Sequence, residues 1–195
     1  MKAGGRMNPL RSVVLVALVL GASAPAQAQR ILVDGQLRQG TLSFDGDATT
    51  GEFTGTTTTM TGQMTGGADL GAVRGWVEAP VNTLKTGNGR RDRDLNKSME
   101  TDKFPTMRFD LASVTPGISR GDSASVTLGG AFTIHGVKRD VTMPATVVYQ
   151  AGAVHLRSSF PLNLTDYQIG GLSKMLGILK MHPDIMVHVD LLFNQ

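Results

Sequence analysis

The chain has 195 residues, of which 41% are hydrophobic and 18% charged, and it contains no cysteine. This composition is typical of one globular domain, and it excludes disorder, a collagen or coiled-coil rod, and a disulfide or zinc-thiolate framework. The formal net charge is +3, but the excess of positive charge lies at the very start of the chain.

Residues 1–28 have the pattern of a secretory signal peptide. A basic start precedes an apolar run at residues 13–20, and Ala26-Gln27-Ala28 matches a small-x-small cleavage site. The apolar run is too short to span a bilayer. An uncleaved membrane anchor is the alternative, and the alanine-rich end with its proline fits it less well. We therefore expect export to the periplasm, or secretion, and a mature domain of residues 29–195.

The expected mature domain carries no net charge. Removal of residues 1–28 takes away three of the 19 basic residues and none of the 16 acidic ones. A neutral body gives no electrostatic reason to bind nucleic acid or an anionic membrane. We expect neither as a partner.

The first half of the mature domain is rich in Gly and Thr and shows a weak alternation of apolar and polar residues, which predicts strands. We expect these strands within residues 31–34, 41–44, 53–64, 72–84 and 107–111. A different period follows residue 89, where Leu95 and Met99 lie four apart among charged residues. This spacing predicts a helix of about three turns over residues 90–101.

The second half alternates strongly, with apolar residues at every second position. It predicts long, one-sided strands over residues 123–134, 141–149, 154–164 and 185–193, with a turn at 135–138 joining the first two. Residues 170–181 have apolar residues at helical spacing after a glycine pair, which indicates a short helix or an ordered flap.

The length of these strands favours a closed barrel over a sandwich, because many sandwich strands have only about five or six residues. A membrane barrel needs aromatic girdles at both interfaces. The chain has 7 Phe, 2 Tyr and 1 Trp, too few for two girdles, so we expect the apolar face to point inward.

The four histidines, His135, His155, His182 and His188, raise the question of metal binding or catalysis. They are scattered over separate predicted strands and turns, whereas a zinc site needs three or four convergent ligands. A Ser/His/Asp set can be chosen from any chain of this size, but no Gly-x-Ser-x-Gly elbow supports one. We expect no metal, no cofactor, no catalytic residue and no enzyme activity.

Several motifs in a fixed order resemble the YceI-like family of exported proteins, and the match covers nearly the whole mature domain. They are Gly51-x-Phe53-x-Gly55, Thr86-Gly87-Asn88, Arg91-Asp92-x-Asp94-Leu95, Lys103 to Phe109, Phe132 to Lys138 and Leu164 to Tyr167.

The resemblance implies an all-β fold, an extended lipocalin-like eight-stranded antiparallel β-barrel with a helical insertion. It also implies that the barrel interior holds a long isoprenoid, such as a polyprenyl phosphate or a quinone-type lipid. The residues that we expect to bind this ligand are Phe53, Asn88, Arg91, Met99, Phe109, Phe132, Ile134, Met143, Phe160 and Leu162.

Two interpretations of the Arg91-Asp92 pair stay open. Arg91 presents a planar donor fork that suits a phosphate headgroup. Alternatively, one residue of the pair caps the helix and locks it against the barrel rim. Most charges of this helix are expected to form a solvated face with ion pairs.

Two functions follow from these expectations. The first is an exported protein that sequesters or carries an isoprenoid in its barrel. The second is a ligand-free structural or stress-related barrel whose interior is filled by its own side chains. The sequence leaves open the identity of the ligand and its headgroup, the physiological pathway and the oligomeric state, a homodimer included.

Overall fold

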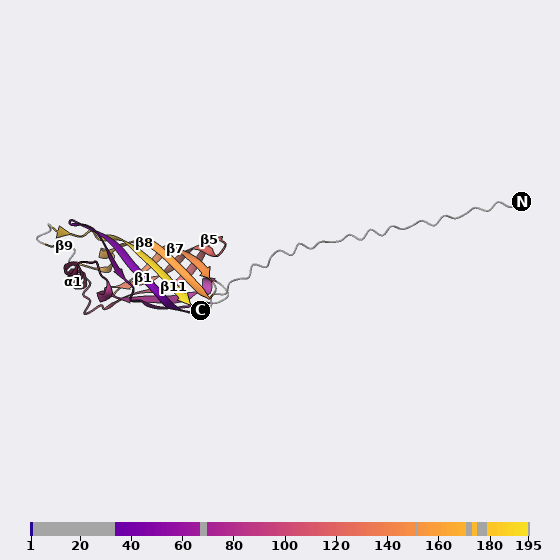
Figure 1. Ribbon diagram of the computed structural model, residues 1–195, viewed down its shortest axis with the longest axis horizontal. Coiled ribbons are helices and arrows are strands. Elements are labelled where there is room, and N and C mark those ends of the chain that lie inside the picture. Colours follow the sequence, from indigo (N-terminus) through magenta and orange to yellow (C-terminus); the bar gives the residue numbers. More distant parts are fainter. Residues whose placement is uncertain (2–33, 67–69, 151, 171–172, 175–178, 195) are drawn as a thin grey trace.

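Figure 1 shows the computed structural model. The described residues are 1, 34–66, 70–150, 152–170, 173–174 and 179–194. Apart from Met1, the expected signal peptide at residues 1–28 lies outside them, and so do residues 31–33 of the first expected strand. The strand that follows begins at Gly35.

A closed antiparallel β-barrel forms the body of the molecule. Its wall has the order β11-β8-β7-β6-β5-β4-β3-β1, and pairing of β1 with β11 closes it. β2 and β3 pair with the same side of β1 at different heights. β3 pairs with its first residues, Gly35 and Gln36, and β2 pairs with residues 42–48. The strands are β1 (Gly35–Ala48), β2 (Gly51–Thr57), β3 (Thr61–Thr65), β4 (Arg74–Pro80), β5 (Thr106–Arg120), β6 (Ser123–Ile134), β7 (Val137–Gln150), β8 (Ala153–Asn163) and β11 (Asp184–Asn194). The expectation of an eight-stranded barrel is confirmed.

The period-two alternation points its apolar residues into the barrel. In β6, Ala124, Val126 and Leu128 are buried, and the intervening Ser125 and Thr127 are exposed. The β6–β7 turn is shorter than expected and consists of His135 and Gly136. Both have positive φ, at 52° and 73°, as a two-residue hairpin of type I′ requires.

β5 is longer than its sequence pattern predicts. Alternation is visible only over residues 107–111, but the strand runs from Thr106 to Arg120. Its pairing with β6 shifts register between Leu111 and Ser113 and again between Pro116 and Ser119. Each irregularity changes the face on which later residues lie, so the periodicity is lost although the strand continues.

At one end of the barrel, the hydrogen-bonded ladder between neighbouring strands is interrupted in two places. We call each interruption a seam. β7 pairs with β8 only from Ala145 to Gln150, and beyond this point Pro144 offers no N–H. The seam is filled by the 3₁₀ turn η3 (Leu164–Tyr167). Arg139 of β7 donates to the Asp166 carbonyl at 2.9 Å, and the His135 ring contacts the Tyr167 carbonyl at 3.0 Å.

The second seam lies between β2 and β4. There the chain after β4 passes through the 3₁₀ turn η2 (Val81–Thr83), and Thr56 of β2 pairs with Lys85 through two backbone hydrogen bonds of 2.9 Å. A third 3₁₀ turn, η1 (Leu70–Ala72), precedes β4 and lies at the other end of that strand. At the end with η2 and η3 the wall therefore contains inserted segments in addition to its strands.

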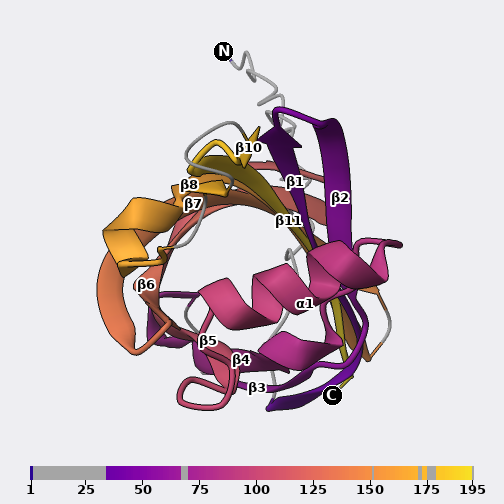
Figure 2. The same ribbon diagram turned by 90° about the vertical axis from the view of Figure 1, so that its left-hand side faces the viewer.

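Helix α1 (Gly89–Ser98) confirms the helix expected at residues 90–101 and ends slightly earlier. Figure 2 shows it lying across one end of the barrel. Of the two alternatives for residues 170–181, a short helix or an ordered flap, the helix is wrong for the described part of that segment. β9 (Ser173–Lys174) and β10 (Leu179–Lys180) pair as a small antiparallel ladder instead, and the remaining residues of the segment, apart from Gly170 and Met181, lie outside the description.

Candidate functional site

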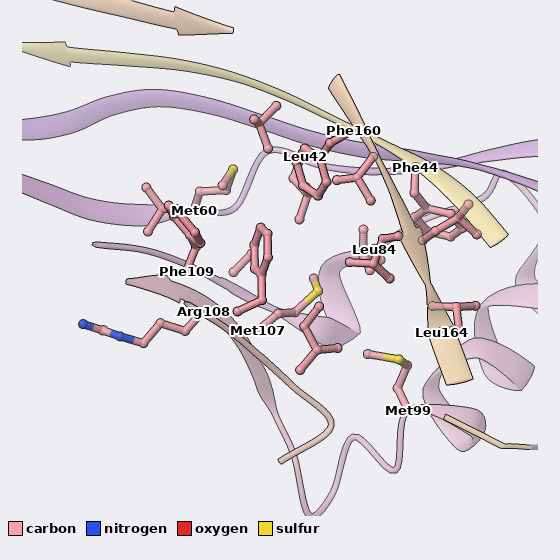
Figure 3. A pocket seen from close by; sticks show the side chains of 18 of the residues that line it. Leu42, Phe44, Met60, Leu84, Met99, Met107, Arg108, Phe109, Phe160 and Leu164 are labelled. Atoms are coloured by element: carbon pink, nitrogen blue, oxygen red, sulfur yellow. The ribbon is translucent and has the colours of Figure 1, made fainter. Parts of the chain in front are cut away.

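A cavity of about 530 Å³ occupies the barrel interior at the end covered by α1. Strands from the whole circumference contribute to its lining, and so do α1 and the segment after η2. Figure 3 shows side chains such as Phe44, Leu84, Met99 and Phe160 gathered around it. This volume lies in the range of about 300–1,000 Å³ that is usual for small-molecule sites.

All ten residues expected to bind a ligand line this cavity. The structure therefore brings together residues that are up to about a hundred positions apart in the chain, and their contact with a ligand stays a prediction. Phe53, Phe109, Phe132, Ile134, Met143, Phe160 and Leu162 lie on strands of the wall, and Asn88, Arg91 and Met99 lie in α1 or at its caps.

Three phenylalanines form a continuous aromatic surface inside the barrel. The rings of Phe109 and Phe132 are 4.7 Å apart, and Phe132 stacks on Phe160 at 5.5 Å. A Cβ atom at Gly130 would lie only 2.7 Å from the Phe109 ring and 2.3 Å from the Asp110 carbonyl oxygen. The glycine at this position therefore makes room for the ring against the wall.

Helix α1 is fixed at the barrel end by its first turn. The Asn88 side chain accepts hydrogen bonds from the backbone N–H groups of Arg90 and Arg91, at 3.0 and 3.2 Å. Asp92 accepts from the Thr86 hydroxyl at 2.7 Å and from the Thr86 N–H at 2.9 Å. The hydroxyl bond, followed by the backbone bond, lowers the pKa of Asp92. Asn88 and Asp92 thus have structural roles here.

Arg91 has a different environment from Asp92. Its guanidinium lies over the Phe53 ring, 4.1 Å from the ring centroid, and it belongs to the cavity lining. Such stacking holds the charged group in place while its N–H edges stay able to donate. Of the two interpretations of the pair, the capping and locking roles belong to Asn88 and Asp92, and Arg91 is the cation positioned at the cavity.

Met99 ends the helix and connects it to the barrel interior. It is the C-cap residue of α1, it is buried, and it lines the cavity together with Leu95, one turn earlier. The four-residue spacing that predicted the helix therefore also identified its inward face.

Several lining residues were not singled out from the sequence. Phe44, Val187, Leu191 and Phe193 lie on strands whose alternation already placed them inside, so the signal for them was present. Leu84 also lines the cavity, but it lies in the irregular segment after η2, where no period marks its direction.

The histidines lie away from the cavity. His155 contacts Asp190, to which Arg157 also donates at 2.9 Å, and His188 lies 3.0 Å from Asp45. Burial opposes ionisation of Asp190, but the hydrogen bonds from His155 and Arg157 outweigh it and lower the pKa of this carboxyl. These contacts tie neighbouring strands together on the outer face.

The structure does assemble one Ser/His/Asp arrangement. The Ser159 hydroxyl lies 2.7 Å from His188, whose other ring nitrogen faces Asp45. All three residues lie on the outer faces of strands, and the Asp45 side chain is 55% exposed. A hydrolase triad depends on a buried carboxylate that orients and stabilises the imidazolium, so this arrangement is a cross-strand contact. Within the described residues, no three His, Asp or Glu side chains group as metal ligands.

Helices long and apolar enough to cross a membrane are absent from the described part of the chain.

The comparison with protein families assigns the chain to a class of domain. The model of the YceI-like domain matches residues 35–193, which is nearly the whole described barrel. The protein therefore belongs to the YceI-like family. No curated protein matches the sequence.

Solved structures with the same fold have little sequence in common with this chain. BcnA of Burkholderia cenocepacia has a TM-score of 0.68 at 15% identity, covering 78% of this chain and 95% of its own. A polyisoprenoid-binding domain of Saccharophagus degradans has a TM-score of 0.69 at 15% identity, covering 82% and 97%. A YceI protein of Campylobacter jejuni has a TM-score of 0.52 at 17% identity, covering 63% and 72%. These similarities establish the shared fold.

Proposed function

We propose that the protein is an exported, non-enzymatic lipid-binding protein that holds an isoprenoid chain in its barrel. The observation that carries the proposal is the apolar cavity of about 530 Å³ inside the barrel. Protein interiors are normally packed with few voids larger than a water molecule. A cavity of this size supports a binding function over a structural barrel filled by its own side chains.

Family membership and one structural neighbour support an isoprenoid as the ligand. The chain belongs to the YceI-like family, and a neighbour of the same fold is a polyisoprenoid-binding domain. The lining fits such a chain chemically, because stacked phenylalanines and flexible methionines such as Met99, Met107 and Met143 adapt to methyl-branched hydrocarbon.

The arrangement of charge supports placing a headgroup at the α1 end. Asn88, Arg90, Arg91 and Asp94 line the cavity there, and Thr49 and Thr50 of the β1–β2 turn also belong to its lining. The fixed guanidinium of Arg91 suits a phosphate, and the surrounding amide and hydroxyl groups suit either a phosphate or the carbonyl oxygens of a quinone.

Extraction of the folded protein followed by mass spectrometry tests the binding function. We expect lipid in the wild type and none in Met143→Trp or Leu162→Phe, which narrow the cavity from the wall. Thr142→Trp places the same large ring on the outer face of β7 and serves as the control that should keep its lipid. Absence of lipid from wild-type protein isolated from its native cells would support the filled structural barrel instead.

The headgroup is tested by adding farnesyl phosphate and a short-chain ubiquinone to delipidated protein. We expect Arg91→Ala to weaken binding of the phosphate about tenfold or more, since a charge-assisted hydrogen bond contributes about 1.5–3 kcal/mol. Ubiquinone binding should stay unchanged. Arg93→Ala, on the same helix but outside the lining, is the control. Equal loss of both ligands in Arg91→Ala would make Arg91 a structural residue of the rim.

A further inference from the structure

The end of the barrel opposite α1 is closed by small side chains. Seven buried residues, all Val or Ala, fill the interior there, beyond the lining of the cavity. We call this group the valine floor. It consists of Val73, Val114, Ala124, Val126, Ala145, Val147 and Val154.

On β6 the lining of the cavity ends at Leu128, and the next inward residues toward the opposite end, Val126 and Ala124, belong to the floor. Leu128, which lines the cavity, pairs across the sheet with Val114 of the floor. On the opposite wall, Phe193 of the lining pairs with Val154 of the floor. A chain that enters from the α1 end therefore meets packed side chains at the level of these two pairs.

The depth of the cavity follows from the strand that runs along it. Alternate residues of β11 from Ile185 to Phe193 line the cavity. With a rise of about 3.3 Å per residue and the usual barrel tilt of about 35–45°, this stretch corresponds to a depth of about 20 Å. An extended isoprene unit advances by four chain bonds of about 1.5 Å each, or about 5 Å along the chain. The depth accommodates about four units.

We propose that the valine floor sets the length of chain that this barrel buries, at about four isoprene units, so that any further units of a longer isoprenoid lie outside the barrel. This inference rests on the proposed function and specifies the substrate for the same site. Val126 and Val147, on the neighbouring strands β6 and β7, are the central residues of this limit.

A series of prenyl alcohols tests the limit. Delipidated protein is titrated with geraniol, farnesol, geranylgeraniol and solanesol, which have two, three, four and nine isoprene units. Each unit that enters the cavity buries apolar surface, so affinity should rise about tenfold per unit up to geranylgeraniol. Solanesol should bind within about threefold of geranylgeraniol, because its additional units stay outside the cavity.

Truncation of the floor should move the limit. Val126→Ala together with Val147→Ala deepens the cavity, and we expect solanesol to gain about tenfold over geranylgeraniol. Val81→Ala removes the same atoms from a valine that is fully buried but lies in η2, outside the lining. It controls for the general effect of a truncated core and should leave the order of affinities unchanged. Leu128→Phe, which fills the deep end, should make farnesol bind as tightly as geranylgeraniol.

The outcomes separate the two proposals. If no prenyl alcohol binds, the proposed function fails. If the alcohols bind but affinity still rises steeply from geranylgeraniol to solanesol in the wild type, the binding function stands and the limit is overturned. A limit that the floor variants leave in place, or that Val81→Ala moves as much as they do, also overturns the role of the valine floor.

Discussion

The two ends of the barrel differ in how their interiors are filled. At both ends every second side chain is apolar and points into the barrel. At the α1 end the inward residues are large, such as Phe44, Phe109 and Phe160, and they surround a cavity. At the other end no residue of the valine floor is larger than valine, and the interior is packed. The end with the larger inward side chains is thus also the end that contains the cavity.

The wall explains this difference. At the closed end β7 pairs with β8 and β3 pairs with β4 in continuous ladders. At the α1 end η3 fills the seam between β7 and β8, and the segment with η2 fills the seam between β2 and β4. Inserted segments widen the circumference, so that large side chains on opposite walls stay apart. In this barrel the breaks in the ladder therefore lie at the end where large side chains surround the cavity.

A charge placed at each end tests this contrast most strongly. Val126→Asp buries an unpaired carboxylate in the packed floor and should lower the free energy of unfolding by about 3–5 kcal/mol. Val189→Asp points into the cavity, where water can reach the carboxylate, and should cost about 1–3 kcal/mol. Urea denaturation of both variants measures the difference. An equal cost, or the reverse order, would show that the two interiors do not differ in packing.

Enlarging a side chain tests the same contrast with apolar residues. Val126→Phe overpacks the floor and should destabilise the protein by about 1–3 kcal/mol. Val187→Phe projects into the cavity beside Phe160 and should change stability by less than about 1 kcal/mol, because space is available there. Thermal unfolding followed by circular dichroism compares the two. A greater loss in Val187→Phe would contradict the position of the cavity.

The attachment of α1 can be weakened at its first turn. Asn88→Ala removes the side-chain cap of the helix and should cost about 1 kcal/mol. Amide hydrogen exchange should increase in α1 and stay unchanged in β6 and β7. Arg93→Ala, at an exposed position inside the same helix, is the control. Increased exchange throughout the barrel would show that α1 stabilises the whole wall and not only its own end.

The smallest effect is expected on the outer face, where stability should depend on pH. Hydrogen bonds from Thr54 and His188 lower the pKa of Asp45 below its ordinary value of 3.8, and the pKa of Asp190 is also lowered. A carboxyl with a lowered folded-state pKa stabilises the fold above its unfolded pKa, and this contribution is lost as pH falls through the folded pKa. Urea midpoints should therefore decrease below about pH 4.

Asp190→Asn separates this contribution from other acid effects. It should cost less than about 1 kcal/mol at pH 7, since exposed ion pairs contribute little, and its stability should decrease less on acidification. Asp122→Asn, in the β5–β6 turn, is the comparison variant. An acid dependence that is identical in wild type and Asp190→Asn would assign the effect to other carboxyl groups.

The sequence by itself determined the strands of the second half, the helix with Leu95 and Met99 facing inward, and the direction of the apolar face. These features follow from local periodicity, because a strand or a helix buries one face and its residues record that face at a fixed spacing. Six of the ten residues expected to bind a ligand lie in the family motifs and four lie in the periodic segments, and the fold brings all ten to one cavity.

The tertiary structure alone decided where the cavity lies, where it ends and how Arg91 and Asp92 divide their roles. The full length of β5 was hidden because bulges interrupt its periodicity, and residues 170–181 showed a helical spacing although their described strands pair as a ladder. Cavity width depends on which strands pair around the whole circumference and which segments fill the seams. That property belongs to contacts between distant residues, and no local pattern in the chain records it.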